Sequence, residues 1–596
     1  MFKKTTPALA LFAILLTAAP RCAAQSGATP ARASGEDDSA READESKRQS
    51  LVADLRALES ESKELRAPLD VASAKAEIAA ALWTLERERA KRLLREALPL
   101  TFPEEVDRAK TREHTIGARL QMGPLEDRAR ALVRGRILTI ASAEPEFARE
   151  LADVTAREMG VVEEVDQYMQ LASAAAGGGR IDEAGDLIRH AMQVEPTLLG
   201  TGFAINEVAA RDRAAADRLM LDYINSLRAL PLSVFTDGGD TGLRVPFSFM
   251  AMLNPSEPFF HSAAAAPPGR EVIRAYVAFV VETVTRAEQS HADITRMRTM
   301  LMLVGPYVAE YAPELTAQFN ALERASRPAG SRAPAMPTLS EMFKSSNKRY
   351  EERLKSARET KDPTVVEVAA TSAMQKNDFE LARELIELLK DERLKAQLSE
   401  MADEKESVYL TNKGELASAQ KLARQLTRPD SVMRAYPPLI RRLSKSGDAA
   451  SAQFLAYDAV QRLKVSAEKE SANDTYVPSL LASVASSIRL FKQSPALRAM
   501  SELALAVEPS GGDTAFEVLD AVSETANKAR ITSELGSANF NAEAFAKLAA
   551  KDGARVRAAA ARFDDRLQRI VALAAAYRGE ADALKAREDS KKRTTR

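Results

Sequence analysis

The clearest structural signal in this 596-residue chain is the stretch YMQLASAAAGGGRIDEAGDLIRHAMQVEP, residues 168–196. A polar turn that begins at Gly179 leads into a segment in which Ala184, Ile188 and Ala191 recur at spacings of four and three. That spacing places the three side chains on one face of a helix. A helix with a single apolar face is not stable alone in water, so it must pack against neighbouring helices.

The same pattern, a polar turn followed by a helix with a small residue at a fixed place, recurs along the chain. Three further copies end at Ala382, Ala419 and Ala452, and looser versions end at Ala148, Ala216 and Ala499. The alanines follow one another at steps of 36 and 32 residues in the first half and 37, 33 and 47 in the second. Two helices and two short turns need about 35 residues. The sequence therefore predicts an all-α fold, a right-handed superhelical array of antiparallel helix pairs, or α-solenoid.

The composition agrees with this fold class and excludes other classes of protein. Strong helix formers are abundant, and runs of β-branched residues with period two are essentially missing. With 28% charged residues, the chain is neither a membrane bundle nor a disordered polymer. The 84 Lys and Arg residues against 85 Asp and Glu residues leave no basic excess to neutralise phosphates, so no nucleic-acid partner is expected.

One unit of the chain resembles a tetratricopeptide repeat. The matching residues are Tyr168, Leu171 and Ala172 in the first helix, Ala184, Ile188 and Ala191 in the second, and Pro196 at the end. Ala175 departs from the family pattern, which has a second aromatic residue there. The other units match only the second helix, and residues 230–340 do not match. The resemblance implies a degenerate helical-repeat scaffold of the bacterial cell envelope whose inner groove binds proteins or peptides, and it implies no catalysis.

Two terminal segments carry helical patterns of their own. Leu567, Ile570, Val571, Ala574 and Tyr577 share one helix face, and we expect Arg566, Gln568 and Arg569 to face outward. Near the start, Leu51, Leu55, Leu58 and Leu65 approximate the seam of a coiled coil. Because that run is shorter than three heptads, a capping helix at the end of the solenoid is the favoured interpretation.

The first residues are typical of a secretion signal. Lys3 and Lys4 precede an apolar run, residues 8–19, that is too short to span a bilayer. Small residues favour cleavage after Ala24. We therefore expect an exported protein, periplasmic or extracellular, with no transmembrane helix in its mature chain.

Cys22 is the only cysteine and would be removed with the signal. A lone cysteine after an apolar run can also carry a lipid, but bulky, charged Arg21 precedes it where lipoprotein signals have small residues. An uncleaved anchor is a third alternative, which the short apolar run disfavours. The mature chain then has neither disulfides nor thiolate metal ligands.

The sequence divides into segments of different character. We expect a signal peptide at 1–24, a disordered spacer at 25–47, N-terminal helical repeats at 48–230, a Pro/Gly/Phe-rich insert at 231–269, helices completing the first half at 270–326, a Pro-rich linker at 327–340, C-terminal repeats at 341–587 and a basic tail at 588–596. The array is thus expected in two halves that the linker joins.

The motifs of common catalytic and metal sites are missing. The histidines are His114, His190, His261 and His291, and none has the paired spacing that places two imidazoles on one helix face. A Gly-rich phosphate loop and a GxSxG elbow are also absent. We therefore expect no catalytic residue, no metal and no cofactor.

Asp240-Thr241-Gly242 looks like the active-site triplet of aspartic proteases. Those enzymes need two such aspartates, so a Gly-rich turn is the favoured interpretation here. A calcium site at Asp237 and Asp240 stays open, although two carboxylates fall short of the oxygens that calcium requires.

The insert concentrates aromatic residues in a chain that is otherwise poor in them. These residues are Phe235, Phe247, Phe249, Phe259 and Phe260. They either fill the groove of the solenoid or form an exposed patch that contacts a partner. They are the candidate partner-binding residues.

The leading functional hypothesis is a non-catalytic scaffold that binds a protein or peptide in its concave groove. One alternative is an all-α toroidal enzyme acting on polysaccharide, but a single tryptophan and 11 tyrosines offer few rings for stacking sugars. The other alternative is a helical protein that encloses a lipid or another small ligand.

Overall fold

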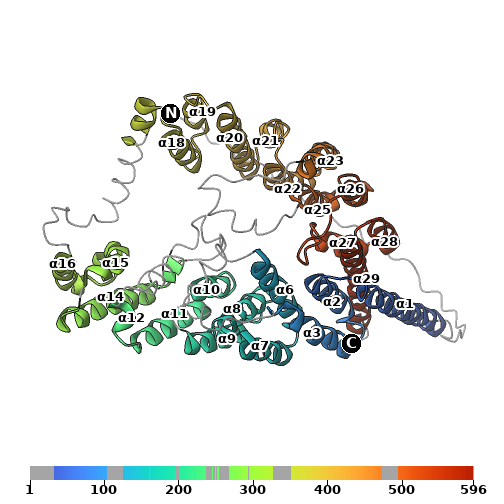
Figure 1. Cartoon of the computed structure of the whole chain (residues 1–596), viewed down its shortest axis with the longest axis horizontal. Coiled ribbons are helices and arrows are strands. Elements are labelled where there is room, and N and C mark those ends of the chain that lie inside the picture. The colour runs from blue at the N-terminus through green and yellow to red at the C-terminus, as the bar shows by residue number, and fades with distance from the viewer. Residues whose placement is uncertain are drawn as a thin grey trace, which may run out of the picture. The chain divides into compact units, whose positions relative to one another are not determined.

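The computed structural model describes residues 33–103, 125–159, 161–195, 200–236, 245, 248–249, 252–253, 267–292, 294–326, 351–352, 354–472 and 494–594. Within these ranges all regular structure is helical, apart from an isolated bridge between Glu534 and Ser537. Figure 1 shows these helices. The all-α prediction is confirmed for this part of the chain.

The helices before residue 327 begin with α1 (Ala33–Ser62), α2 (Pro68–Leu82), α3 (Arg87–Ala97), α6 (Leu125–Ala141), α7 (Pro145–Met159), α8 (Val161–Gly177) and α9 (Ile181–Val194). They continue with α10 (Gly200–Ala209), α11 (Arg213–Arg228), α12 (Ser233–Thr236), α14 (Arg270–Gln289), α15 (Arg298–Tyr311) and α16 (Thr316–Ala325). Helices adjacent in sequence pack in pairs, for example α8 with α9.

The helices after residue 350 are α18 (Pro363–Gln375), α19 (Phe379–Ile386), α20 (Glu392–Lys413), α21 (Leu416–Ala423), α22 (Pro429–Lys445), α23 (Ala449–Ala472), α25 (Pro495–Val507), α26 (Thr514–Lys528), α27 (Ala542–Ala549), α28 (Gly553–Ala561) and α29 (Arg566–Thr594). Here too sequence neighbours pair, as α18 with α19 and α25 with α26.

The turn residues of the repeated sequence pattern share one backbone conformation. Gly179, Asn377, Gly414 and Gly447 have φ angles of 78°, 59°, 86° and 87°. At each turn the N–H of the next residue donates to the carbonyl five residues earlier, at 2.9–3.0 Å. This is the Schellman arrangement that ends a helix, and it requires a left-handed residue, which glycine and asparagine adopt most easily. The repeated turn is therefore a helix C-cap.

Buried apolar side chains form three clusters. The first combines residues 51–322 with 567–584, the second covers 419–576, and the third covers 354–402. Helix α29 contributes to both the first and the second cluster, and it packs against α2 as well as α27 and α28 (Figure 1).

The N-terminal segment differs from the sequence prediction. Helix α1 begins at Ala33, so the second part of the expected spacer, residues 33–47, is helical. Most of its side chains from Glu42 onward are exposed, and Gln49 donates to Glu45 one turn earlier at 3.2 Å. Strong helix formers with local side-chain pairs can extend a docked helix without burying apolar surface. The described residues as far as Gln49 belong to a separate unit from the described residues that begin at Ser50.

The C-terminal helix also departs from expectation. Gln568, which the sequence pattern placed outward, is fully buried, and its Nε2 donates to the carbonyl of Ile531 at 3.0 Å. Arg569 forms an ion pair rather than facing water alone. The expected basic tail is helical as far as Thr594. Both sides of α29 are covered here, whereas a single apolar stripe predicts only one covered side.

The two expected breaks are only partly described. The insert contains helix α12, and the linker at 327–340 lies outside the described residues. No described helix is long and apolar enough to cross a bilayer.

Candidate binding surface

The residues singled out for repeat packing lie in the core. Tyr168, Leu171, Ala172, Ala184, Ile188, Ala191, Ala382, Ala419 and Ala452 are at most 5% exposed, and Pro196 lies outside the described residues. Ala184 follows the left-handed Gly179 by five residues, and the other three motif alanines follow their turns at the same interval. The cap thus fixes which side of the next helix meets its neighbour.

Two of the five candidate partner-binding phenylalanines have described positions, and both are buried. Phe249 stacks on the ring of Tyr276, with centroids 3.8 Å apart, and packs against Tyr223. Phe235 meets Phe279 edge to face at 6.0 Å. These two rings fill the core between helices and offer no surface to a partner. Phe247, Phe259 and Phe260 lie outside the described residues, where the prediction of partner contact stays open.

The described part of the chain contains no cluster of three or more side chains that could hold a metal ion. The ring of His190 rests against Tyr168 at 4.3 Å, and His291 sits at a left-handed turn with φ of 56°. His114, His261, Asp237 and Asp240-Thr241-Gly242 lie outside the described residues.

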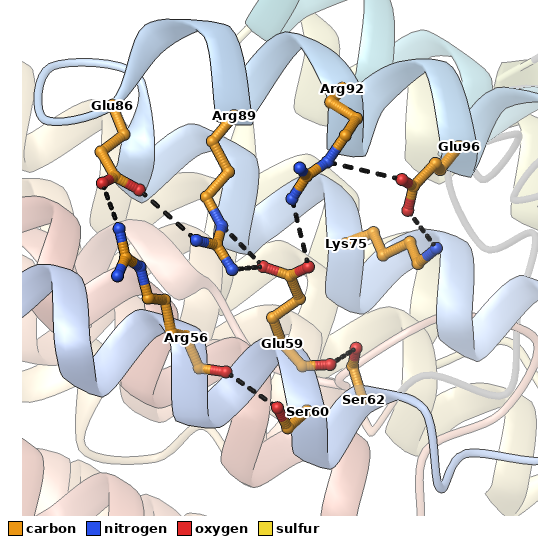
Figure 2. Close-up of polar contacts among 9 residues, drawn as sticks. All are labelled: Arg56, Glu59, Ser60, Ser62, Lys75, Glu86, Arg89, Arg92 and Glu96. Atoms are coloured by element: carbon orange, nitrogen blue, oxygen red, sulfur yellow. Dashed lines mark hydrogen bonds and ion pairs between the residues drawn. The ribbon is translucent and has the colours of Figure 1, made fainter.

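Seven charged side chains of alternating sign connect the first three helices (Figure 2). In order they are Arg56, Glu86, Arg89, Glu59, Arg92, Glu96 and Lys75, joined at distances from 2.6 to 3.7 Å. Glu59 of α1 receives two bonds from Arg89 and lies within 3.6 Å of Arg92, both on α3. Each charge of this ladder already faces an opposite charge, so we interpret it as a device that fixes α1 on α3.

The feature that packing does not explain is an apolar stripe on α23. Phe454, Tyr457 and Val465 are 55%, 57% and 55% exposed. Their spacing of three and eight residues, with exposed Gln461 between them, places them on one side of the helix. The other large, exposed apolar side chains among the described residues are Leu132 on α6, Phe203 on α10 and Met302 on α15, one on each helix. We call Phe454, Tyr457, Gln461 and Val465 the α23 stripe.

The opposite side of α23 explains why the stripe faces outward. Leu455, Ala456, Ala459, Val460 and Leu463 are buried in the second core cluster. They pack against α22, α25 and α26. Because three helices hold that side, the helix cannot rotate to bury the stripe without emptying the core.

Polar contacts at the edges hold the stripe in place. The Arg424 guanidinium lies 4.9 Å from the centre of the Phe454 ring. Asp458, next to Tyr457, pairs with Arg462 at 3.1 Å and accepts a hydrogen bond from Tyr436. Burial raises the pKa of the Tyr436 hydroxyl, and the nearby Asp458 charge raises it further. The result is an apolar centre with a polar rim, the composition of a protein-contact surface.

A shallow groove of about 420 Å³ lies between α11, α14 and α16. Its lining side chains are polar or charged, and two of them, Arg228 and Glu282, pair with each other at 3.2 Å.

Sequence reasoning missed the α23 stripe. The repeat pattern identifies Ala452 of this helix as a packing residue and predicts nothing about the opposite side. The available signal was that large apolar residues at 454, 457 and 465 lie off the face that contains Ala452, Ala456 and Leu463.

Comparison with known proteins adds no family. No family model matches the chain. No curated protein matches it either. Among solved structures, the chain is similar to a circular tandem repeat protein with novel repeat topology and enhanced subunit contact surfaces. That similarity has 12% sequence identity, covers 87% of this chain and 98% of the other, and has a TM-score of 0.19, which is too low to support an argument.

Proposed function

We propose that this chain is a non-catalytic helical-repeat scaffold that binds a protein or peptide, and that the α23 stripe contacts the partner. The observation that carries the proposal is three large apolar side chains, each more than half exposed, on one side of one helix. Monomeric proteins rarely leave such a group uncovered without a use for it.

The geometry of the stripe favours an amphipathic helix as its occupant. Positions 454, 457, 461 and 465 follow spacings of three, four and four. Residues at these intervals form the ridge that packs into the groove of another helix. The partner then presents apolar residues at the same intervals, with polar residues beside Arg424 and Asp458.

The test replaces exposed Gln461, in the middle of the stripe, with a photo-reactive residue in the full-length protein. In extracts of cells that make the protein, we expect a crosslink to one defined partner. The double variant Phe454→Ala/Tyr457→Ala weakens that partner's binding at least tenfold, because aromatic residues near the centre of a contact contribute most of its affinity. Leu132→Ala is the matched control, since Leu132 is a single exposed apolar residue on α6 at 51% exposure.

Two outcomes would overturn the proposal. One is a crosslink from position 461 only into the chain itself, which would mean that its own residues cover the stripe. The other is a partner that binds the double variant and the Leu132→Ala variant with the same affinity. Circular dichroism of both variants checks that the helices remain formed.

The proposal includes export to the periplasm or the cell exterior and a tetratricopeptide-like origin of the repeat. Support comes from the basic start and short apolar run of residues 1–24 and from the buried repeat residues between Tyr168 and Ala191. Mass spectrometry of the protein recovered from separated cell fractions tests the export. A mature chain that starts at Gln25 in the envelope or medium agrees with it, and an intact chain confined to the cytoplasm contradicts it.

A further inference from the structure

Helix α29 is shared by two hydrophobic cores. The residues on its first side, Leu567, Ile570, Val571, Ala574, Tyr577, Ala581 and Leu584, belong to the cluster that contains residues 51–322. Those on its second side, Ala572, Ala575 and Ala576, belong to the cluster of residues 419–563. The last helix of the chain thus packs on the first half through one side and on the second half through the other.

The contact of α29 with the second half is close. A Cβ atom at Gly579 would overlap the carbonyl oxygen of Ala546 on α27, and a Cβ at Gly553 of α28 would overlap Glu580. At Gly579, only glycine allows the backbones of α29 and α27 to approach in this way, whereas the close neighbour of Gly553 is the Glu580 side chain. Arg578 adds an ion pair to Glu543 of α27 at 2.7 Å. Helix α29 is therefore an integral part of the second half.

The contact of α29 with the first half joins residues that are 508 and 502 positions apart in sequence. Arg569 pairs with Glu61 at 2.5 Å, and Arg566 pairs with Glu64 at 2.9 Å. Just before α27, the backbone N–H of Gly536 donates to Asp70 of α2 at 2.9 Å. Leu51, Leu55 and Leu58 of α1 are buried in the same cluster as Leu567 and Ile570. These N-terminal leucines thus cover the contact between α29 and the first half.

An ion pair with a buried carboxylate lies in the same region. Arg136 of α6 bonds the carboxylate of Glu77 on α2 at 2.6 and 3.0 Å. Burial alone would raise the pKa of Glu77, but Arg136 and, less strongly, Arg578 of α29 hold it below its ordinary value. The charge on α29 therefore stabilises a carboxylate of the first half.

Along the chain, the two halves are joined covalently through the segment 327–340. No described residue of the third cluster, 354–402, belongs to the core that contains α16. We propose that α29, seated on α1 and α2, is the joint between the two halves, so that they stay bound to each other when the chain is cut within 327–340. The first half then acts as a receptor whose partner is an alanine- and leucine-rich helix of its own chain.

The test uses the full-length chain with a protease recognition sequence placed between Pro328 and Pro337. After cleavage we expect the two fragments to elute together from a sizing column as a one-to-one complex, with an unchanged helical circular-dichroism signal. In the Arg569→Glu background, the added repulsion against Glu61 should raise the dissociation constant of the cut halves at least tenfold.

The control is Arg587→Glu, which makes the same charge change on an exposed position of α29 beyond the seat. This variant should leave the dissociation constant of the cut halves unchanged. Separation of the unsubstituted fragments at micromolar concentration would overturn the proposal, as would a complex of two copies of each fragment. Unfolding of each uncut variant is measured first, so that a loss of fold is not read as a loss of association.

Discussion

Helices α23 and α29 both carry apolar side chains on two sides, but they differ in what covers the second side. On α29 the second side consists of Ala572, Ala575, Ala576 and Gly579, and α27 packs directly on it. On α23 it consists of Phe454, Tyr457 and Val465, which are exposed. Small residues admit a neighbouring backbone and so indicate permanent packing. Large residues on an uncovered side are the reason why we propose that α23 contacts a separate partner.

The largest expected effect comes from adding one methyl group to the covered side of α29. Gly579→Ala should destabilise the protein by more than about 3 kcal/mol, because the new Cβ overlaps the carbonyl oxygen of Ala546. Gly177→Ala is the matched control. It lies at the end of helix α8 with no atom within 4 Å of the added Cβ, so its change should stay within about 0.5 kcal/mol. Urea unfolding measures the loss of stability in both variants. Equal losses would contradict close packing of α27 on the second side of α29.

The next largest effect on stability is expected from removing the charge of Glu77, which lies beside α29. Glu77→Gln should cost about 2 kcal/mol at pH 7, because the Arg136 guanidinium then loses its buried counter-charge. The folded pKa of Glu77 is lowered from 4.5, so its charge stabilises the fold above that pH and ceases to do so as the pH falls through the folded value. The difference between wild type and variant should therefore shrink below about pH 4.5.

Urea unfolding at a series of pH values from 7 to 3.5 checks this. Glu524→Gln, beside α23, replaces an exposed partner of Lys464 and should change stability by less than about 0.5 kcal/mol. A Glu77→Gln difference that stays constant across the series would show that the lost stability is not due to the carboxylate charge.

The repeat turns show how much of the fold was predictable. Gly179, Asn377, Gly414 and Gly447 were found from sequence because a left-handed cap favours glycine or asparagine. The structure has the same cap at His291 and Arg530, where the N–H of the next residue again donates five residues back at 2.9 Å. Histidine and arginine adopt a left-handed turn less readily than glycine, so these two turns were not predicted from the sequence.

The contact between the two ends of the chain was not predictable from one sequence. The face of Leu567, Ile570 and Val571 was correctly expected to be apolar, but nothing in its spacing identifies α1 and α2 as the neighbours. The ion pair of Arg569 with Glu61 joins residues 508 positions apart. The outward position expected for Gln568 was wrong because alanines and glycine on the second side of α29 conceal a second interface.

A smaller difference in stability is expected between two valine-to-alanine substitutions. Val571→Ala on α29 should cost about 1.5 kcal/mol, since Val571 is 4% exposed and its lost methyl groups leave a gap in the core. Val465→Ala on the α23 stripe should change stability by less than about 0.5 kcal/mol, because water already covers that side chain. The shift of the denaturant midpoint measures both costs, provided that the slope of the unfolding free energy against denaturant stays the same. A cost at Val465 as large as that at Val571 would mean that the folded chain itself covers the stripe.

The smallest effect is the coupling within one ion pair beside each helix. Arg569 and Glu61 lie 2.5 Å apart with side chains that are 27% and 28% exposed, whereas Lys464 and Glu524 lie 3.7 Å apart and are 34% and 57% exposed. A double-mutant cycle to alanine should give a coupling of about 1 kcal/mol for the first pair and less than about 0.3 kcal/mol for the second. Added salt should reduce the second coupling more, because solvent-exposed charges are screened more strongly. Equal couplings with equal salt dependence would place both pairs in the same environment, and the distinction between a permanent junction at α29 and an open surface at α23 would lose its electrostatic support.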